Sequence, residues 1–255
     1  MIYPNFKMLL PKRLKQLLSC SLCVGVSACL ALHAQERCSV EVKLLLSPAE
    51  IQSAKSALNV KNEVGGLVYF FDTDSLDLLA KGLILRLRRG ATSDLTIKLR
   101  PREGKKFFAA HEEGFKCEED FTGDGAIPSY SISRKYTGEQ LPETGADITR
   151  LLSPGQKKLL KEANISIDWL RVKRIVEIRA TTWETRKRKR KLTLEAWEWP
   201  DGKIVEISTR ATSGDGPTTY AELQKLAAES GLSLRPIQGF KTGIVLESVT
   251  HAKAK

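Results

Sequence analysis

Histidine is scarce in this chain: three occur among the 255 residues, and they form no recognisable catalytic set. The cysteines and histidines also lack the spacing that is typical of a zinc site. No glycine-rich P-loop is present, which excludes a phosphate-cradling loop of that kind. The sequence is instead rich in cations and carries a formal net charge of +11.

The chain also lacks internal repeats and low-complexity linkers, and its glycine and proline contents are ordinary. This composition indicates a folded globular domain rather than a disordered chain. One domain of this length buries a substantial core.

The N-terminus carries basic residues followed by an uncharged apolar run from Leu17 to Leu32. The run is shorter than the roughly 20 residues of a membrane span, so the pattern is typical of an export signal. We predict a signal peptide over residues 1–34, cleaved after Ala34, and a single domain over residues 35–255, exported to the periplasm or outside the cell. Two alternatives are an uncleaved anchor and a lipoprotein signal, because the residues that end at Cys29 resemble a bacterial lipobox.

Five cysteines are present, and three of them fall within the predicted signal. Only Cys38 and Cys117 remain beyond it. Two cysteines in an exported protein predict one disulfide bond. The alternative is a pair of unpaired buried thiols.

Local patterns predict several elements. Leu192–Glu195 and Lys203–Ser208 form a predicted hairpin. Ser153–Gln156 is a capping box at the start of a helix. Ile165–Ile178 is predicted as a strand, and residues 124–147, rich in Gly, Ser, Pro and Thr, are predicted as a loop.

A second predicted hairpin, Leu83–Arg89 with Asp94–Arg100, has an apolar face and a cationic face, because apolar and cationic residues alternate along both strands. The cations are Arg86, Arg88, Lys98 and Arg100. On pattern alone we favour a half-buried sheet with its cations in water. The alternative is a barrel with the cations inside and the leucines outside, under helices. Cations inside a barrel are costly unless an anion or carboxylates compensate them.

The hairpin and the strand before it carry a family signature, made of Tyr69–Thr73, Leu85–Arg88 and Thr96–Lys98 in this order and at this spacing. It resembles the CYTH-domain family, the triphosphate tunnel metalloenzymes. The resemblance extends from Ser39 to about Leu246. It implies an α+β fold: a closed antiparallel β-barrel of about eight strands that forms a tunnel, with helices packed outside.

The resemblance also implies a phosphate-binding wall of cations inside the tunnel. Its members would be Lys43, Arg86, Arg88, Lys98, Arg100, Lys241 and one or both of Lys173 and Arg174. Arginine forks and lysine point charges suit a polyanion such as tripolyphosphate.

Carboxylates on several strands would hold Mg²⁺ or Mn²⁺, which prefer oxygen ligands. The candidate metal ligands are Glu41, Glu118, Asp120, Glu195 and Glu206, and Lys43 and Glu206 are the candidate catalytic residues. Ser39 and Ser208 stand where the family has two further carboxylates. Taken alone, the strand with Glu118 and Asp120 also fits a solvated edge strand.

A run of six basic residues, Arg186–Lys191, has three possible explanations. It could bind nucleic acid, contact an anionic membrane, or form a solvated turn between Thr181–Thr185 and Leu192–Trp197. We favour the turn, because no aromatic RNA-binding motif accompanies it.

Two functions are consistent with these residues. The first is a metal-dependent hydrolase of triphosphate or polyphosphate. The second is a catalytically impaired module that binds polyanions in the cell envelope. The expected partner is a phosphate-rich small molecule or polyphosphate. No nucleic acid is expected, and a membrane is expected only through the signal or a lipid on Cys29. A nucleotide cyclase is less favoured because an exported protein has little access to ATP.

Overall fold

A computed structural model describes residues 38–101, 112–123 and 125–253. The predicted signal peptide, its cleavage after Ala34 and the alternative lipid on Cys29 lie outside the described residues. Within the described part of the chain, no helix is long and apolar enough to span a membrane.

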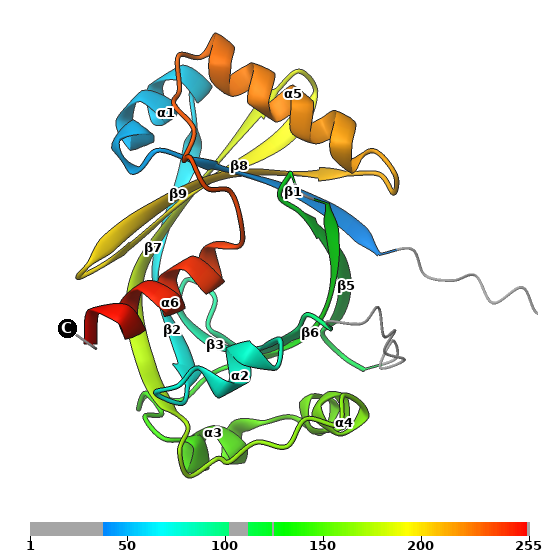
Figure 1. Cartoon of the computed structure of the whole chain (residues 1–255), viewed down its shortest axis with the longest axis vertical. Helices are drawn as coiled ribbons and strands as arrows, with labels where there is room; N and C mark the ends of the chain where they lie inside the picture. The colour runs from blue at the N-terminus through cyan, green and yellow to red at the C-terminus, as the bar shows by residue number, and fades with distance from the viewer. Residues whose placement is uncertain (1–37, 102–111, 124, 254–255) are drawn as a thin grey trace, which may run out of the picture. The chain divides into compact units, whose positions relative to one another are not determined.

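Nine strands of the described chain close into one barrel (Figure 1). They are β1 (Ser39–Leu46), β2 (Lys61–Asp72), β3 (Leu83–Gly90), β4 (Asp94–Leu99), β5 (Phe115–Phe121), β6 (Ala126–Lys135), β7 (Lys173–Lys187), β8 (Arg190–Trp199) and β9 (Gly202–Ala211). Their order around the barrel is β1-β5-β6-β4-β3-β2-β7-β8-β9, and β9 pairs back with β1.

The closed barrel predicted from the family resemblance is confirmed, with two refinements. It has nine strands rather than about eight, and the β1–β5 pair is parallel. The two observations are connected, because an odd number of strands cannot alternate in direction all the way around a closed barrel.

Most helices pack outside the barrel wall, and α6 (Lys241–Lys253) lies across the barrel opening, where it contributes residues to the cavity lining (Figure 1). The other described helices are the 3₁₀-helix η1 (Pro48–Glu50) and the α-helices α1 (Ile51–Leu58), α2 (Asp77–Ala80), α3 (Gly145–Leu151), α4 (Pro154–Glu162) and α5 (Gly216–Glu229). Leu58 of α1 and Leu223 of α5 pack on one side, in a core with residues of β1, β8 and β9. Val245 of α6 packs instead against Phe70 and Ile84.

The structure decides between the two interpretations of the β3–β4 hairpin. Leu85 and Leu87 are buried on the outer face, in a core with Ile148 of α3 and Leu159 of α4. The alternating side chains therefore point inward. The cations of this hairpin line the barrel cavity, and Arg88 among them is still exposed to solvent.

Several local predictions are confirmed. The hairpin of β8 and β9 is present. Ser153 and Gln156 form the reciprocal bonds of a capping box at the start of α4. The turn favoured for the basic run is present but shorter than predicted: Arg188 and Lys189 form it, and the other four residues of the run belong to β7 and β8.

Two local predictions are wrong. The segment predicted as a loop contains β6, which hydrogen-bonds with β4 and β5. The strand predicted over Ile165–Ile178 begins only at Lys173 and continues to Lys187. β6 was missed because strand pairing across the barrel outweighs local preference, whereas residues 165–172 lie outside the paired part of β7.

Candidate active site

The barrel encloses a cavity of about 450 Å³ that gathers charged side chains from many strands. Its cationic lining consists of Lys43, Arg86, Arg88, Lys98, Arg100, Lys116, Arg210 and Lys241. Its acidic lining consists of Glu41, Asp94, Glu118, Glu195 and Glu206. Most of the site residues predicted from the sequence therefore meet in one place.

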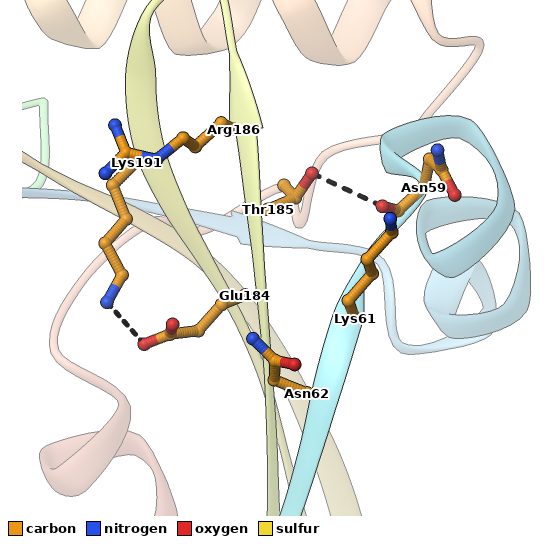
Figure 2. A pocket seen from close by; sticks show the side chains of 7 residues that line it. All are labelled: Asn59, Lys61, Asn62, Glu184, Thr185, Arg186 and Lys191. Carbon is orange, nitrogen blue, oxygen red and sulfur yellow. Dashed lines mark hydrogen bonds and ion pairs between the residues drawn. The ribbon is translucent and has the colours of Figure 1, made fainter.

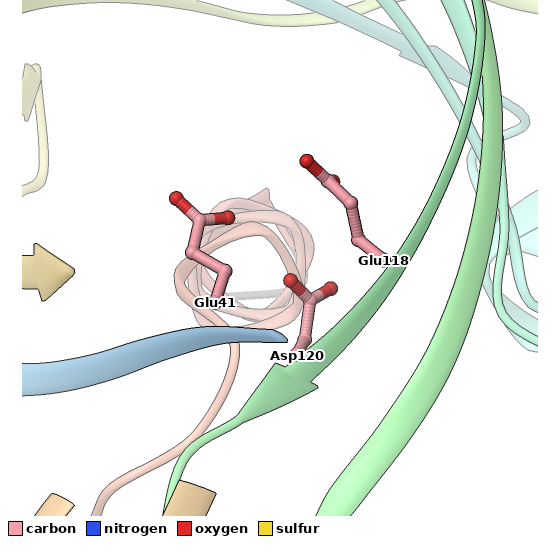
Figure 3. A group of neighbouring side chains, drawn as sticks. All are labelled: Glu41, Glu118 and Asp120. Atoms are coloured by element: carbon pink, nitrogen blue, oxygen red, sulfur yellow. The ribbon is translucent and has the colours of Figure 1, made fainter. Parts of the chain in front are cut away.

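One acidic group lies where β1 and β5 run side by side. Glu41, Glu118 and Asp120 each contribute a carboxylate oxygen, and these oxygens lie within 4.8 Å of one another (Figure 3). The parallel register explains the grouping, because Glu41 is paired with Asp120 and Ser39 with Glu118. Glu118 thus brings a carboxylate to the strand position next to Ser39, where the family pattern has an acid.

Asp120 is fully buried and contacts three cations. Its carboxylate lies 2.5 Å from Lys43 Nζ, 2.9 Å from Lys98 Nζ and 2.9 Å from a terminal nitrogen of Arg100. Burial alone would raise the pKa of Asp120, but these cations outweigh burial and hold the pKa far below its usual range. Asp120 therefore stays ionised and anchors three cations in the cavity wall.

Lys43 lies between two sets of carboxylates. Its ammonium is 3.1 Å from Glu41. Burial disfavours its charge, but Asp120, Glu41 and Glu206 outweigh burial and raise its pKa above the usual value. Lys43 is therefore a permanent cation near neutral pH.

The second acidic group joins β8, β9 and the start of α6. Glu195 and Glu206 face each other across the β8–β9 ladder. The Lys241 ammonium contacts Glu195 and lies 2.8 Å from Glu206 Oε1. It also lies 4.5 Å from the centre of the Trp197 ring, whose Nε1 donates a hydrogen bond to Glu195 at 2.7 Å. Lys241 is thus held at the start of α6 by two carboxylates and an aromatic face.

The electrostatics of this second group favour its charged form. Burial opposes ionisation of Glu195, but Lys241 and the Trp197 hydrogen bond outweigh burial and lower the pKa of Glu195 to about 2. The pKa of Lys241 is raised by the same two carboxylates, against the effect of burial. Glu206 Oε2 is buried and has no hydrogen-bond partner among the described residues. That oxygen is free to accept a hydrogen bond from a ligand or water.

The arginine pair of β3 is less completely compensated. A terminal nitrogen of Arg86 donates to Thr96 Oγ1 at 3.2 Å and lies 3.6 Å from Asp94, while its Nε is buried without a partner among the described residues. Burial and the charge of Arg88 lower the pKa of Arg86 to about 10. Arg88 lies 3.8 Å from the same Asp94. The Asp94 carboxylate therefore compensates two guanidiniums, which leaves N–H donors of these arginines available to bind an anion.

Two predicted phosphate-binding residues lie elsewhere. The Lys173 ammonium is 2.8 Å from Asp74, and Arg174 is 3.3 Å from Glu143. Neither residue lines the cavity. The chain has a register irregularity between Phe70 and Phe71, where β2 pairs with this end of β7. A bulge changes which side chains face inward, and alternation read from the sequence alone does not reveal it.

Cys38 and Cys117 form a disulfide bond, with their Cα atoms 4.7 Å apart. They lie one residue before Ser39 and Glu118, which are paired in the β1–β5 ladder. The disulfide therefore joins the two strands that carry the first acidic group.

The lining residues that were not identified from the sequence include Asp94, Trp197, Arg210 and Phe240. Arg210 lies on the same inward face of β9 as Glu206 and Ser208, so the alternation of the sequence could have identified it as a lining residue. Asp94 is paired with Arg88 in the β3–β4 register, which the hairpin pattern does not fix. The Phe240 ring stacks 4.0 Å from the Arg100 guanidinium, a contact between distant segments.

Comparison with known proteins supports the fold assignment. No protein-family model matches the chain, and no curated protein matches it in sequence. A candidate adenylyl cyclase from Hippeastrum with a dominant triphosphatase activity matches in structure with a TM-score of 0.55 and 20% identity, covering 82% of this chain and 94% of that one. A candidate adenylate cyclase from Bacillus halodurans matches with a TM-score of 0.54 and 16% identity, covering 80% and 95%. The chain has the fold of the CYTH-domain, triphosphate tunnel proteins, as its signature predicted.

Proposed function

We propose that the protein hydrolyses triphosphate- or polyphosphate-type substrates in the barrel cavity, with the help of a divalent metal. The observation that supports this function most directly is the meeting of arginine and lysine donors with a three-carboxylate group inside one enclosed space. The triphosphatase activity of the Hippeastrum protein adds support, because that protein shares the fold.

The residues present fit a hard divalent cation. Glu41, Glu118 and Asp120 offer carboxylate oxygens close enough together to share one ion, and Mg²⁺ or Mn²⁺ prefers such oxygen ligands. The β1–β5 group offers three carboxylates and the Glu195–Glu206 pair offers two, so we assign the metal first to the β1–β5 group, where it would share these oxygens with Lys43 and Lys98. When bound, the ion would neutralise phosphate oxygens and acidify a bound water.

The chain's own residues bind and orient the phosphates. Arg86, Arg88, Lys98 and Arg100 offer hydrogen-bond donors to the equatorial oxygens, where charge gathers during phosphoryl transfer. Lys43 remains charged and therefore stabilises negative charge rather than accepting a proton. Glu206 has a free buried oxygen with which it would orient the attacking water. No covalent nucleophile is needed.

A second candidate function is binding without turnover. Lys241 occupies both carboxylates of the β8–β9 pair, and Ser39 and Ser208 stand where the family pattern has acids. A cavity of this kind would still bind a polyanion through its arginines and lysines. The protein would then be a polyanion-binding module of the cell envelope.

We also propose that the protein acts outside the cytoplasm. The sequence pattern of an export signal supports this location. The Cys38–Cys117 disulfide adds support, because such bonds persist mainly in oxidising compartments. Tripolyphosphate or polyphosphate then fits better than ATP as the substrate, and no nucleic-acid partner is proposed.

The first experiment measures phosphate release from tripolyphosphate by the purified protein with Mg²⁺, Mn²⁺ or EDTA. We expect metal-dependent release, and we expect Glu206→Gln to lower kcat about a hundredfold because the oriented water is lost. Glu198→Gln is the matched control: this glutamate is on β8, is paired with Lys203, and does not line the cavity. Absence of release, together with tight binding in EDTA, would establish the binding module instead.

A further inference from the structure

The basic run Arg186–Lys191 is divided between two faces of the β7–β8 hairpin. On one face, Arg190 lies 2.9 Å from Glu222 of α5, and the turn residue Arg188 contacts Glu229 of the same helix. Arg188 and Lys189 form the turn and have positive φ angles of 48° and 66°, which residues other than Gly, Asn and Asp rarely adopt. Arg188 and Arg190 of the basic run therefore attach the hairpin to α5 through ion pairs.

Arg186 and Lys191 lie on the opposite face, which continues the cavity wall. The β7–β8 register is unbroken from Arg179 to Lys187, so Arg186 shares its face with Thr182, and Lys191 shares its face with Thr193. Both threonines line the cavity. Strand residues rise about 3.4 Å each, so Arg186 lies about 14 Å beyond Thr182 along the strand.

Arg210 of β9 connects this face to the cavity. It is an exposed residue of the cavity lining. Thr209 is paired with Leu192 in the last pair of the β8–β9 ladder, and Arg210 and Lys191 follow directly beyond that pair. On its other side, Arg210 is paired with Glu41 of β1. Arg210, Lys191 and Arg186 together form a row of cations that leads out of the cavity, here called the outer track.

The charge of the outer track is only partly compensated. Arg186 and Lys191 stand directly opposite each other in the ladder, an arrangement of like charges that costs stability. Lys191 lies 2.6 Å from Glu184, and Figure 2 shows these two side chains meeting beside the hairpin. Among the described residues, Arg186 has no ion-pair partner. A pocket of about 430 Å³ lies along this part of the hairpin and is lined by Lys61, Glu184, Arg186 and Lys191, among others.

We propose that the outer track binds the part of a linear polyphosphate chain that extends beyond the cavity. The preferred substrate class is then long-chain polyphosphate rather than tripolyphosphate. The inference rests on the proposed function, in which the cavity holds the end of the chain. Polyphosphate carries negative charge along its length, which fits a row of cations continuous with a cationic cavity. It would also relieve the repulsion between Arg186 and Lys191.

The test compares binding and hydrolysis of tripolyphosphate and of linear polyphosphate of about a hundred phosphates. Dissociation constants are measured in EDTA, so that binding is separated from turnover, and phosphate release is measured with Mg²⁺. We define the preference for the long chain as the dissociation constant of tripolyphosphate divided by that of long-chain polyphosphate. In the double variant Arg186→Gln/Lys191→Gln, we expect this ratio to fall about fivefold.

Arg150→Gln/Lys157→Gln is the matched control, since it removes the same two charges from α3 and α4, away from the hairpin. It should leave the ratio unchanged. An unchanged ratio in the hairpin variant would overturn the inference, and phosphate release from tripolyphosphate would still establish the hydrolase. Absence of hydrolysis, with a long-chain preference that the hairpin variant loses, would overturn only the hydrolase. Loss of binding to phosphatidylglycerol vesicles without any change in the polyphosphate ratio would overturn the outer track in favour of membrane contact.

Discussion

At the scale of single residues, Arg86 places a guanidinium inside the barrel beside a second guanidinium, that of Arg88. Its pKa is lowered to about 10 by burial and by this neighbour, so the fold is less stable with the charge than it would be without it. A buried cation with an unpartnered Nε is compensated when an anion binds. The cost to stability is therefore consistent with a binding role.

Replacing Arg86 with alanine is expected to weaken tripolyphosphate binding by about tenfold or more, the usual effect of losing a charge-assisted hydrogen bond. Isothermal titration calorimetry in EDTA measures this affinity without turnover. Arg89→Ala is the control from the same strand, because Arg89 alternates to the other face and donates to the Glu139 carbonyl at 3.2 Å. Equal affinities in Arg86→Ala and the wild-type protein would rule out the proposed phosphate site on β3.

At the scale of elements, the pairing of β1 with β5 closes the barrel and builds the first acidic group. The ladder contains four residue pairs, from Ser39↔Glu118 to Val42↔Phe121. The Cys38–Cys117 disulfide reinforces one end of this short ladder and closes a loop with a sequence separation of 79 residues.

Removing the disulfide by Cys38→Ser/Cys117→Ser is expected to lower the free energy of unfolding by about 3 kcal/mol, because the unfolded chain regains the freedom of a long loop. We also expect weaker Mn²⁺ binding, because Glu41 and Glu118 lie next to the released end. Urea unfolding and electron paramagnetic resonance of free Mn²⁺ measure the two effects. Wild-type protein under reducing conditions should behave like the variant, and a variant as stable as the oxidised protein would contradict the role of the bond.

The elements that the sequence predicts correctly are those that depend on residues close together in the chain. The β3–β4 hairpin and the capping box of α4 depend on neighbours in the chain, and both were predicted correctly. β6 was missed because its residues, with Pro128 and several serines, look like a loop until β4 and β5 pair with both edges. The inward cations of β3 were identified through the family signature, whereas Asp94 depended on a register that no local pattern specifies.

Long-range contacts limited the prediction of the site in the same way. Lys241 was expected in the tunnel, but its contact with Glu195 and Glu206 brings α6 to a hairpin more than thirty residues earlier in the chain. The grouping of Glu41 with Glu118 and Asp120 depends on the one parallel pair of the barrel, which the predicted antiparallel barrel did not contain.

At the scale of the whole barrel, buried ion pairs link the stability of the fold to pH. Asp120 and Glu195 have pKa values lowered on folding, and Lys43 and Lys241 have pKa values raised. The two carboxylates therefore contribute stability above their ordinary pKa values, and this contribution is lost as the pH falls. The two lysines contribute stability below their ordinary pKa values, and this contribution is lost as the pH rises through the raised values. Stability from these pairs is thus greatest between about pH 5 and pH 10.

The loss of stability below pH 5 can be predicted in more detail. Protonation of Glu195 alone is expected to lower the free energy of unfolding by about 3 kcal/mol between pH 5 and pH 2. The reason is that the pKa of Glu195 falls from 4.5 to about 2 on folding. Urea unfolding followed by tryptophan fluorescence measures the change, because Trp183 and Trp197 are buried. Glu195→Gln should flatten the acid slope, whereas Glu198→Gln, at an exposed carboxylate of the same strand, should keep it. If both variants kept the wild-type slope, the charged Glu195–Lys241 pair would not stabilise the barrel.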